Sequence, residues 1–271
     1  MKRKQIVLLC CTLAVAAFLL IGILGSLQIE VTNYTVSHKD IPQAFQGFRI
    51  AQISDLHNDE FGSSNEKLLA LLKTAAPDII VITGDLIDSY HTDVDISADF
   101  MEQAMQIAPC YYVCGNHEMR IPNDYATLKK RMKACGVTIL EDRSVLLTRE
   151  NASLQLTGLE DRSRLTSQQV FHLLDISSYN ILLSHRPEHF SVYGDIGADL
   201  VLSGHAHGGQ IRLPLIGAIF APGQGLFPEY ADGIHTAGGT TLAISRGLGN
   251  SSFPFRFYCP PELVIITLQS E

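Results

Sequence analysis

The stretch RIAQISDLH (49–57) decides the fold, because a run typical of a buried strand ends abruptly in polar side chains. Four further stretches repeat this arrangement along the chain. They are DIIVITGD (78–85), CYYVCGNHE (110–118), YNILLSH (179–185) and DLVLSGHAHGG (199–209). Strands in α/β sheets present functional groups at their carboxyl ends, so side chains that are distant in sequence can converge there. We therefore expect the polar ends of these strands to form one site.

Helical patterns separate the first of these strands. Ser63 and Glu66 fit a capping box ahead of a leucine-rich helix. Further helices are expected near 97–108, 123–135 and 166–175, while the middle and the C-terminal part of the chain are rich in short strands. Alternating strands and helices, followed by many strands, predict an α/β fold in which helices flank two packed sheets.

Seven polar residues at the strand ends are candidate metal ligands: Asp55, His57, Asp85, Asn116, His185, His205 and His207. Their imidazole, carboxylate and amide donors suit manganese, iron, cobalt or zinc, and match neither a thiolate zinc site nor an all-oxygen calcium site. One Asp-x-His or His-x-His pair is weak support, because a spacing of two only places both side chains on one face. A single histidine is more simply a hydrogen-bonded structural residue. Five of the ten histidines lie at these strand ends, however, and together they favour a metal site.

The motifs DLH, GD, GNHE, SH and GHAH, in this order, resemble those of the calcineurin-like metallophosphoesterase superfamily over about residues 47–270. The resemblance implies a four-layer α/β/β/α sandwich with a dimetal site between the loops of the two sheets. The form SGHAHGGQ (203–210) and the closing SRGLG (245–249) and PPELVIITL (260–268) resemble a membrane-associated bacterial branch. That branch is similar to enzymes that cleave the pyrophosphate of UDP-2,3-diacylglucosamine.

The resemblance also implies how the ligands divide between two metals. The first metal would be held by Asp55, His57 and His207. The second would be held by Asn116, His185 and His205. Asp85 would bridge both metals. His117 would lie beside the phosphate without binding metal, and Glu118 would orient His117, so these two residues are the expected catalytic pair.

Two divalent cations are the expected cofactors, with manganese preferred and iron, zinc or cobalt also suitable. Metals about 3.5–4 Å apart can lower the pKa of a bridging water, hold phosphate oxygens and neutralise developing charge. His117 would then stabilise the transition state or protonate the leaving oxygen. The expected reaction is in-line hydrolysis of a phosphate ester or anhydride.

The N-terminal region contains the uncharged run Ile6–Leu27, which as a helix would span roughly 33 Å, enough to cross a hydrocarbon core. A cleaved signal peptide is the alternative. Lys2, Arg3 and Lys4 precede the run, so the positive-inside rule predicts a single-pass cell-membrane protein whose catalytic domain is extracytoplasmic. The expected division is a cytoplasmic stub with a transmembrane anchor, a connector and a catalytic domain: 1–27, 28–46 and 47–271.

The charge balance argues against nucleic acid as a partner. From Gln28 onward the chain carries 17 basic and 28 acidic residues, so it repels phosphate backbones, and no basic run offsets this. The six cysteines do not form a disulfide framework, and free thiols are expected.

Two segments near the candidate site allow more than one interpretation. The run LPLIGAIFAPGQGLF (213–227) is most simply a core strand with a loop, and the alternative is an acyl-chain or membrane-facing surface beside the metals. Asp88, His91 and Asp93 could lie near the site, although an exposed polar loop is the simpler interpretation.

The favoured function is hydrolysis of a phosphodiester or pyrophosphate bond in a phosphate-containing small molecule or lipid, such as a UDP-diacylglucosamine-like precursor. A phosphoprotein phosphatase is less attractive, because neither a regulatory tail nor paired arginines are recognisable. A catalytically inactive metal-bound scaffold is a third possibility. The presence of all seven ligands and of His117 argues against it.

Overall fold

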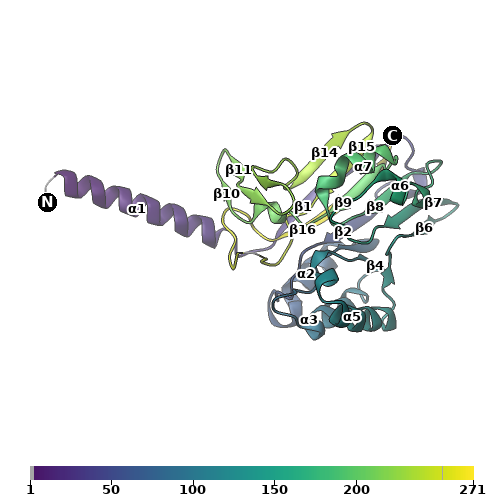
Figure 1. Ribbon diagram of the computed structural model, residues 1–271, viewed down its shortest axis with the longest axis horizontal. Helices are drawn as coiled ribbons and strands as arrows, with labels where there is room; N and C mark the ends of the chain where they lie inside the picture. Colours follow the sequence, from purple (N-terminus) through teal and green to yellow (C-terminus); the bar gives the residue numbers. More distant parts are fainter. Residues whose placement is uncertain (1–2, 252) are drawn as a thin grey trace.

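Two six-stranded sheets form the centre of the molecule (Figure 1). The computed structural model describes residues 3–251 and 253–271, with only the backbone described at 3, 4 and 6–8. In spatial order, the first sheet contains β1 (Glu30–His38), β16 (Glu262–Ser270), β2 (Arg49–Ile53), β3 (Ile79–Thr83), β4 (Cys110–Val113) and β5 (Thr138–Ile139). The second contains β14 (Gly233–Ala237), β15 (Thr240–Ile244), β9 (Leu200–Ser203), β8 (Asn180–Leu183), β7 (Ala152–Gly158) and β6 (Arg143–Arg149). The first sheet therefore joins the N-terminal strands to the last strand of the chain.

An apolar core lies between the two sheets. Ile50, Val81 and Ile266 of the first sheet belong to the same fully buried cluster as Leu156 and Leu202 of the second. Both faces of the central strands are covered, which explains why these strands appear in the sequence as nearly continuous apolar runs. Burial of this apolar surface is the main force that holds the sheets together.

Helices cover the outer faces of both sheets, as expected for four layers. α2 (Glu66–Ala75), α3 (Val94–Ala104) and α5 (Pro122–Ala134) pack on the first sheet. α6 (Ser167–Val170) and α7 (Phe190–Asp195) pack on the second. The predicted α/β/β/α arrangement is present (Figure 1), although the helix expected at 166–175 is short.

The starts of two helices show how local chemistry sets their bounds. The predicted capping box of Ser63 and Glu66 is wrong, because α2 begins after Asn65, whose left-handed backbone (φ 61°) gives no side-chain cap. The Asn65 side chain instead accepts the Phe61 backbone N–H at 3.0 Å. α3 has the usual cap, in which Asp93 accepts two backbone N–H groups of the first turn.

Short elements connect the main layers. α4 (Asn116–Arg120) follows β4 directly and begins at a predicted metal ligand. Among the described residues, the connections also include five 3-10 helices: η1 (Gln43–Phe45), η2 (Ser63–Asn65), η3 (Phe171–Leu173), η4 (Pro187–His189) and η5 (His207–Gly209). The last of these begins at another predicted ligand, so the candidate site lies where strands pass into tight turns.

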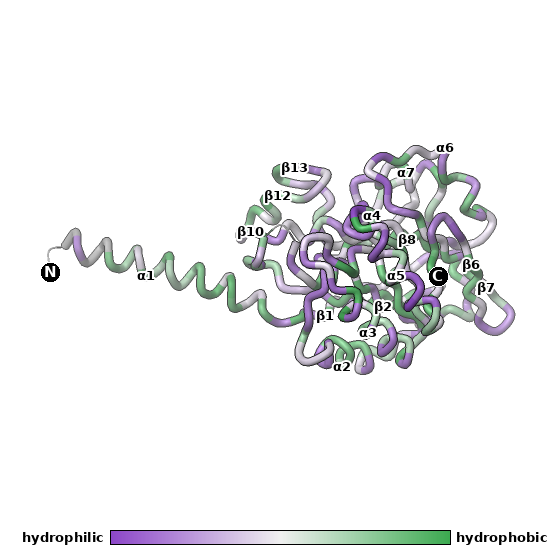
Figure 2. Tube along the Cα trace, turned by 60° about the horizontal axis from the view of Figure 1, so that its bottom comes forward, coloured by the Kyte–Doolittle hydropathy of each residue, from purple (hydrophilic) through white to green (hydrophobic). Residues whose placement is uncertain are grey.

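The N-terminal helix α1 (Arg3–Leu24) projects from one end of the two-sheet body and is hydrophobic along most of its length (Figures 1 and 2). Within the part of the chain that the structure describes, none of the helices is long and apolar enough to cross a membrane. Lys2 lies outside the described residues, and the side chains of residues 6–8 are likewise not described. The anchor over Ile6–Leu27 therefore stays a prediction.

The region 28–46, predicted to be a connector, contributes a strand to the first sheet. β1 pairs in parallel with β16 along nine residues, from Glu30 opposite Glu262 to His38 opposite Ser270. The polar pattern of this strand reflects its position at the edge of the sheet, where much of it is exposed. This part of the chain is therefore integral to the two-sheet body.

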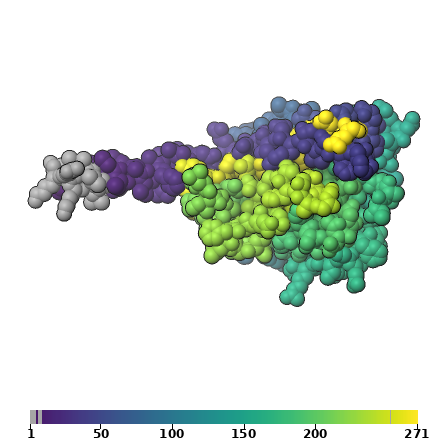
Figure 3. All heavy atoms as spheres, turned by 90° about the horizontal axis from the view of Figure 1, so that it is seen from above, coloured from purple at the N-terminus to yellow at the C-terminus, as the bar shows by residue number. Residues whose placement is uncertain are grey.

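The apolar run 213–227 forms two small hairpins, and its interpretation as core is wrong. The hairpins contain β10 (Arg212–Leu213) with β11 (Gly217–Ala218) and β12 (Phe220–Ala221) with β13 (Gly225–Leu226). Leu215 is fully exposed, and Leu226 is 70% exposed. We call residues 213–227 the apolar lobe. It lies at the same end of the molecule as the C-terminal end of α1 (Figures 1 and 3).

Candidate metal centre

The structure brings all seven predicted ligands together at the carboxyl ends of strands from both sheets. Three groups among the described residues have donor atoms within 4.8 Å of one another, and two of them share Asp85, whereas the third contains His57, Asp88 and His117. Of the two that share Asp85, one contains Asp55, His57, Asp85 and His207, and the other contains Asp85, His185 and His205. Every one of these side chains is buried. Asp85 belongs to both groups, which is the position expected of a bridging ligand.

The first group follows β2 and β9. The Nε2 atoms of His57 and His207 lie 3.1 Å apart, and His207 Nε2 lies 3.3 Å from a carboxylate oxygen of Asp55. His57 Nε2 is 3.7 Å from Asp85 Oδ2. Two imidazole nitrogens and two carboxylates thus converge on one point, as a tetrahedral or higher coordination site requires.

The second group follows β3, β4 and β8. His185 Nε2 lies 3.2 Å from Asp85 Oδ2 and 3.1 Å from His205 Nδ1. Asn116 Oδ1 is 3.3 Å from the same His185 nitrogen, so the amide oxygen lies next to this group. The donor chemistry of both groups fits borderline divalent cations.

Strained backbone and close packing fix the ligands in place. Five of them have left-handed backbones: Asp55 (φ 52°), His57 (50°), Asp85 (51°), His205 (65°) and His207 (52°). Non-glycine residues rarely adopt this conformation, which costs about 1–3 kcal/mol each and persists only where surrounding structure enforces it. At Gly204, a Cβ atom would lie 1.8 Å from Ser54 Oγ and 2.3 Å from Asp55 Oδ2. Glycine alone allows this approach.

Hydrogen bonds behind the ligands set which ring nitrogens face the site. His185 Nδ1 lies 2.8 Å from the Thr83 carbonyl oxygen, which can only accept, so Nδ1 carries the proton and Nε2 is free for a metal. His57 Nδ1 lies 3.2 Å from Asp88 Oδ2 and is fixed in the same way. The backbone N–H of His205 donates to both oxygens of Asp55.

The Asp85 side of the site favours positive charge. Although burial opposes it, the Asp85 carboxylate raises the pKa of His185 to about 10. The pKa of Asp85 is in turn lowered well below its usual value, because His185 and His57 outweigh the effect of burial. Burial dominates in the first group, where it raises the pKa of Asp55 and lowers that of His207 well below its usual value. The Asp85 carboxylate is thus the group that most favours a neighbouring cation.

His117 lies beside the metal groups, as predicted. Its Nδ1 accepts the backbone N–H of Ser89 at 3.1 Å. Burial lowers the pKa of His117 to about 4 against the opposing effect of Asp85, and the ring is therefore neutral near pH 7. The Arg120 guanidinium lies 3.2 Å from Nε2. A small cavity of about 90 Å³ is lined by both residues and by Asp85 and Asn116.

Glu118 has a different role from the one predicted. Its carboxylate accepts the backbone N–H groups of Asp85, Leu86, Ile87 and Gly115 at 2.7–3.2 Å. Glu118 therefore ties the loop after β3 to the turn after β4, and so positions Asp85. The expectation that it orients His117 is wrong, because Ser89 holds that ring.

Two arginines at the site were not predicted from the sequence, and an exposed loop was favoured for Asp88. Asp88 is buried, not part of an exposed loop, and its Oδ1 accepts the backbone N–H groups of Tyr90 and His91 while Oδ2 faces His57. Arg186 Nη1 lies 3.4 Å from His205 Nε2. With Arg120 beside His117, two guanidinium groups border the site, although the sequence showed no paired arginines. In the sequence, the position of Asp88 three residues after the predicted ligand Asp85 was the signal that could have placed it at the site.

Comparisons with known proteins agree with this geometry. The family model described as calcineurin-like phosphoesterase matches residues 48–209. The metallophosphoesterase YkuE of Bacillus subtilis is 34% identical, with 89% of this chain and 86% of YkuE covered. The phosphodiesterase YaeI of Escherichia coli is 29% identical, with 82% of each chain covered. The sulfate thiohydrolase SoxB of Thermus thermophilus shares the fold at a TM-score of 0.53 and 12% identity, over 85% of this chain and 58% of SoxB. The chain therefore belongs to the calcineurin-like phosphoesterase family and is a metallophosphoesterase with a candidate site for two divalent metal ions.

Proposed function

We propose that this metallophosphoesterase hydrolyses phosphodiester or pyrophosphate bonds with two divalent cations, manganese first among them. The observation that supports this most directly is the pair of ligand groups that share Asp85. Bound there, the cations would supply an activated water and neutralise charge on the phosphate. The phosphodiesterase YaeI, 29% identical to this chain, supports diester hydrolysis.

The chain's own residues then orient the phosphate and the leaving group. His117 and Arg120 line the same small pocket as Asp85, with Arg120 Nη1 3.2 Å from His117 Nε2. The guanidinium carries only donors and forms charge-assisted hydrogen bonds with phosphate oxygens. In this proposal Arg120 holds a non-bridging oxygen of the phosphate, and His117 lies beside the leaving oxygen.

A large cavity beside the metal groups favours a substrate with a bulky second substituent. About 1140 Å³ in volume, it is lined by the metal ligand His57 and by the polar side chains of Asn58, Asp88 and Thr92. Tyr90 lines both this cavity and the small metal pocket, so the two adjoin. A bare phosphomonoester would leave this cavity unused, whereas a diester or pyrophosphate would place its second group there.

The finer proposal concerns location and substrate. The uncharged run Ile6–Leu27 and the exposed apolar side chains of α1 support a single-pass anchor with an extracytoplasmic catalytic domain. A substrate carried by the membrane, such as a UDP-diacylglucosamine-like lipid precursor, would suit an enzyme held there. A reporter fused after Glu271 should be extracytoplasmic, and loss of about the first 27 residues from the isolated protein would identify a signal peptide instead.

One assay tests the proposed reaction against its alternatives. The full-length protein, loaded in turn with manganese, iron, cobalt or zinc, is given a soluble diester, a monoester, a nucleotide diphosphate and a lipid pyrophosphate. We expect turnover of diester or pyrophosphate above monoester, and no turnover after chelation. Preference for monoesters would favour a phosphoprotein phosphatase. Two bound metals without turnover of any substrate would favour an inactive scaffold.

A further inference from the structure

Several large apolar side chains are exposed around the mouth of the metal site. We call them the apolar rim: Leu215, Ile216, Phe220, Leu226, Phe227 and Phe255. Five of them lie in the apolar lobe, whose residues 213–227 include no charged side chain. Leu215 (φ 70°) and Phe227 (φ 52°) even have left-handed backbones, which bulky residues rarely adopt. Large apolar side chains exposed in one segment of the chain mark an interaction site.

The rim borders the entrance to the metal site. Pro222, between β12 and β13, lines the same small pocket as the metal ligands His205 and His207. Ser251 lines that pocket from the loop that leads to Phe255. The apolar lobe, which carries five of the rim residues, therefore also contributes to the lining of the metal pocket.

The end of α1 is packed firmly beside the rim. The Phe18 ring lies 5.4 Å from the ring of Phe257 and 5.3 Å from that of Tyr258. The backbone N–H of Tyr258 donates to the Gly22 carbonyl at 3.1 Å. A Cβ atom on Gly22 would lie 2.1 Å from the Phe257 ring, so glycine is needed for this contact. Phe18 and Gly22 lie one helical turn apart, on the face of α1 that meets the body.

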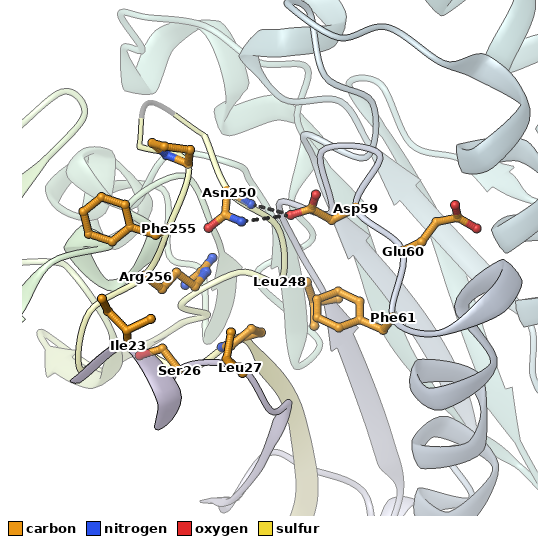
Figure 4. A pocket seen from close by; sticks show the side chains of 12 residues that line it. Ile23, Ser26, Leu27, Asp59, Glu60, Phe61, Leu248, Asn250, Phe255 and Arg256 are labelled. Atoms are coloured by element: carbon orange, nitrogen blue, oxygen red, sulfur yellow. Dashed lines mark hydrogen bonds between the residues drawn. The ribbon is translucent and has the colours of Figure 1, made fainter. Parts of the chain in front are cut away.

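A cavity of about 320 Å³ lies between the end of α1 and the body. Ile23 and Leu27 of the α1 end line it together with Phe61 and Phe255, which lie at opposite sides of the view in Figure 4. Asp59 and Asn250, joined by hydrogen bonds in the same view, line both this cavity and the larger one beside the metals. The two cavities therefore adjoin between the end of α1 and the metal site.

We propose that the apolar rim docks into the surface of a lipid bilayer. The surface of α1 away from the body presents Leu13, Leu20 and Leu24 to the surroundings, each more than half exposed. Because α1 is fixed next to the rim, an environment that covers this helix also covers the rim. A bilayer can cover a helix and two adjoining hairpins of different shape at once, whereas a second copy of the chain would need a complementary surface. The docking itself does not depend on which reaction the protein catalyses. Its consequence, that the metal site opens at the level of the lipid headgroups, rests on the proposed function.

The natural absence of tryptophan from the chain gives a direct test. A Leu226→Trp variant places a single tryptophan in the rim. A Leu146→Trp variant places one on β6, at the opposite end of the body (Figure 1), at a matched exposure of 66% against 70%. Both full-length variants are reconstituted into phosphatidylcholine vesicles with and without brominated chains, and soluble-diester turnover or thermal unfolding checks that each is folded.

We expect the tryptophan fluorescence of Leu226→Trp to lie at shorter wavelength than that of Leu146→Trp. Brominated lipid should also quench it roughly twofold more, because a docked side chain lies about 5–10 Å inside the headgroup boundary. Equal quenching, or failure of the protein to associate with vesicles, would overturn the proposal. A shorter wavelength without bromine quenching would also overturn it and indicate self-association. Leu215→Trp repeats the test if Leu226→Trp does not fold. Quenching without turnover would leave the docking intact and refute only the proposed reaction.

Discussion

The metal pocket and the apolar rim depart in opposite directions from the usual distribution of side chains. In the pocket, Asp55 and Asp85 are fully or almost fully buried, although charged groups are rarely buried unless paired. In the rim, Leu215 and Leu226 are exposed next to a polar site. Both regions also hold bulky residues in left-handed backbone. Each departure is explained by a component outside the chain, cations for the pocket and, in our proposal, lipid for the rim.

The largest effect is expected from Asp85→Ala. Both ligand groups contain this carboxylate, so its removal should leave neither cation site complete and should abolish nearly all turnover. Metal content of the purified protein should fall at both positions, whereas His57→Ala and His185→Ala should each weaken mainly one. Asp124→Ala, at an exposed helix start, is the matched control. A variant that keeps two metals and most activity would refute the bridge.

His117→Ala should separate catalysis from metal binding in the pocket. His117 contacts Ser89 and borders the phosphate position, but it belongs to neither ligand group that contains Asp85. Both metals should therefore stay bound while the rate falls about 10²–10⁴-fold, the usual contribution of a placed proton donor. The loss should be smaller for a nitrophenyl ester, whose leaving group needs no proton. Equal losses for good and poor leaving groups would point to charge stabilisation instead.

Asp88→Asn should have an intermediate effect. The carboxylate fixes His57 through Nδ1 and holds the loop that carries Ser89, the partner of His117. An amide keeps the shape but removes the charge that orients the imidazole, so we expect metal affinity or activity to fall about 10–100-fold. Metal titration followed by steady-state kinetics at saturating metal separates the two contributions. Unchanged values for both would show that Asp88 is only structural.

The pocket could be predicted from sequence far better than the rim. Each ligand directly follows an apolar run, and the run itself identifies a buried strand whose end faces the site, as at Asp55 after β2 and His185 after β8. Arg186 was missed, and Asp88 was assigned to an exposed loop, because their roles depend on contacts between loops, which no local pattern encodes. The role of Glu118 was misjudged for the same reason, since its partners are backbone groups of a distant loop.

The rim was misjudged because hydrophobicity alone does not tell an exposed apolar surface from a core strand. Residues 213–227 have the composition of core, but their strands are only two residues long and pair only with each other. Neither of the two six-stranded sheets includes these strands. Likewise, the edge position of β1 gave it the polar pattern of a linker. Whether such a segment forms core, sheet edge or surface depends on which strands it pairs with in the folded protein, and this pairing overrides local propensity.

The smallest effect, and the one specific to the rim, is expected from Leu226→Ser. The leucine is exposed in the protein alone, so its loss should leave folding and soluble-diester turnover unchanged. For a substrate embedded in vesicles, docking through fewer apolar carbons should raise the Michaelis constant about four- to tenfold, since each buried methylene contributes about 0.8 kcal/mol. Leu146→Ser on β6 removes an equally exposed leucine far from α1 and should change neither measurement. Equal effects of the two substitutions, or an effect of Leu226→Ser on the soluble diester, would mean that the lobe stabilises the metal pocket rather than contacting lipid.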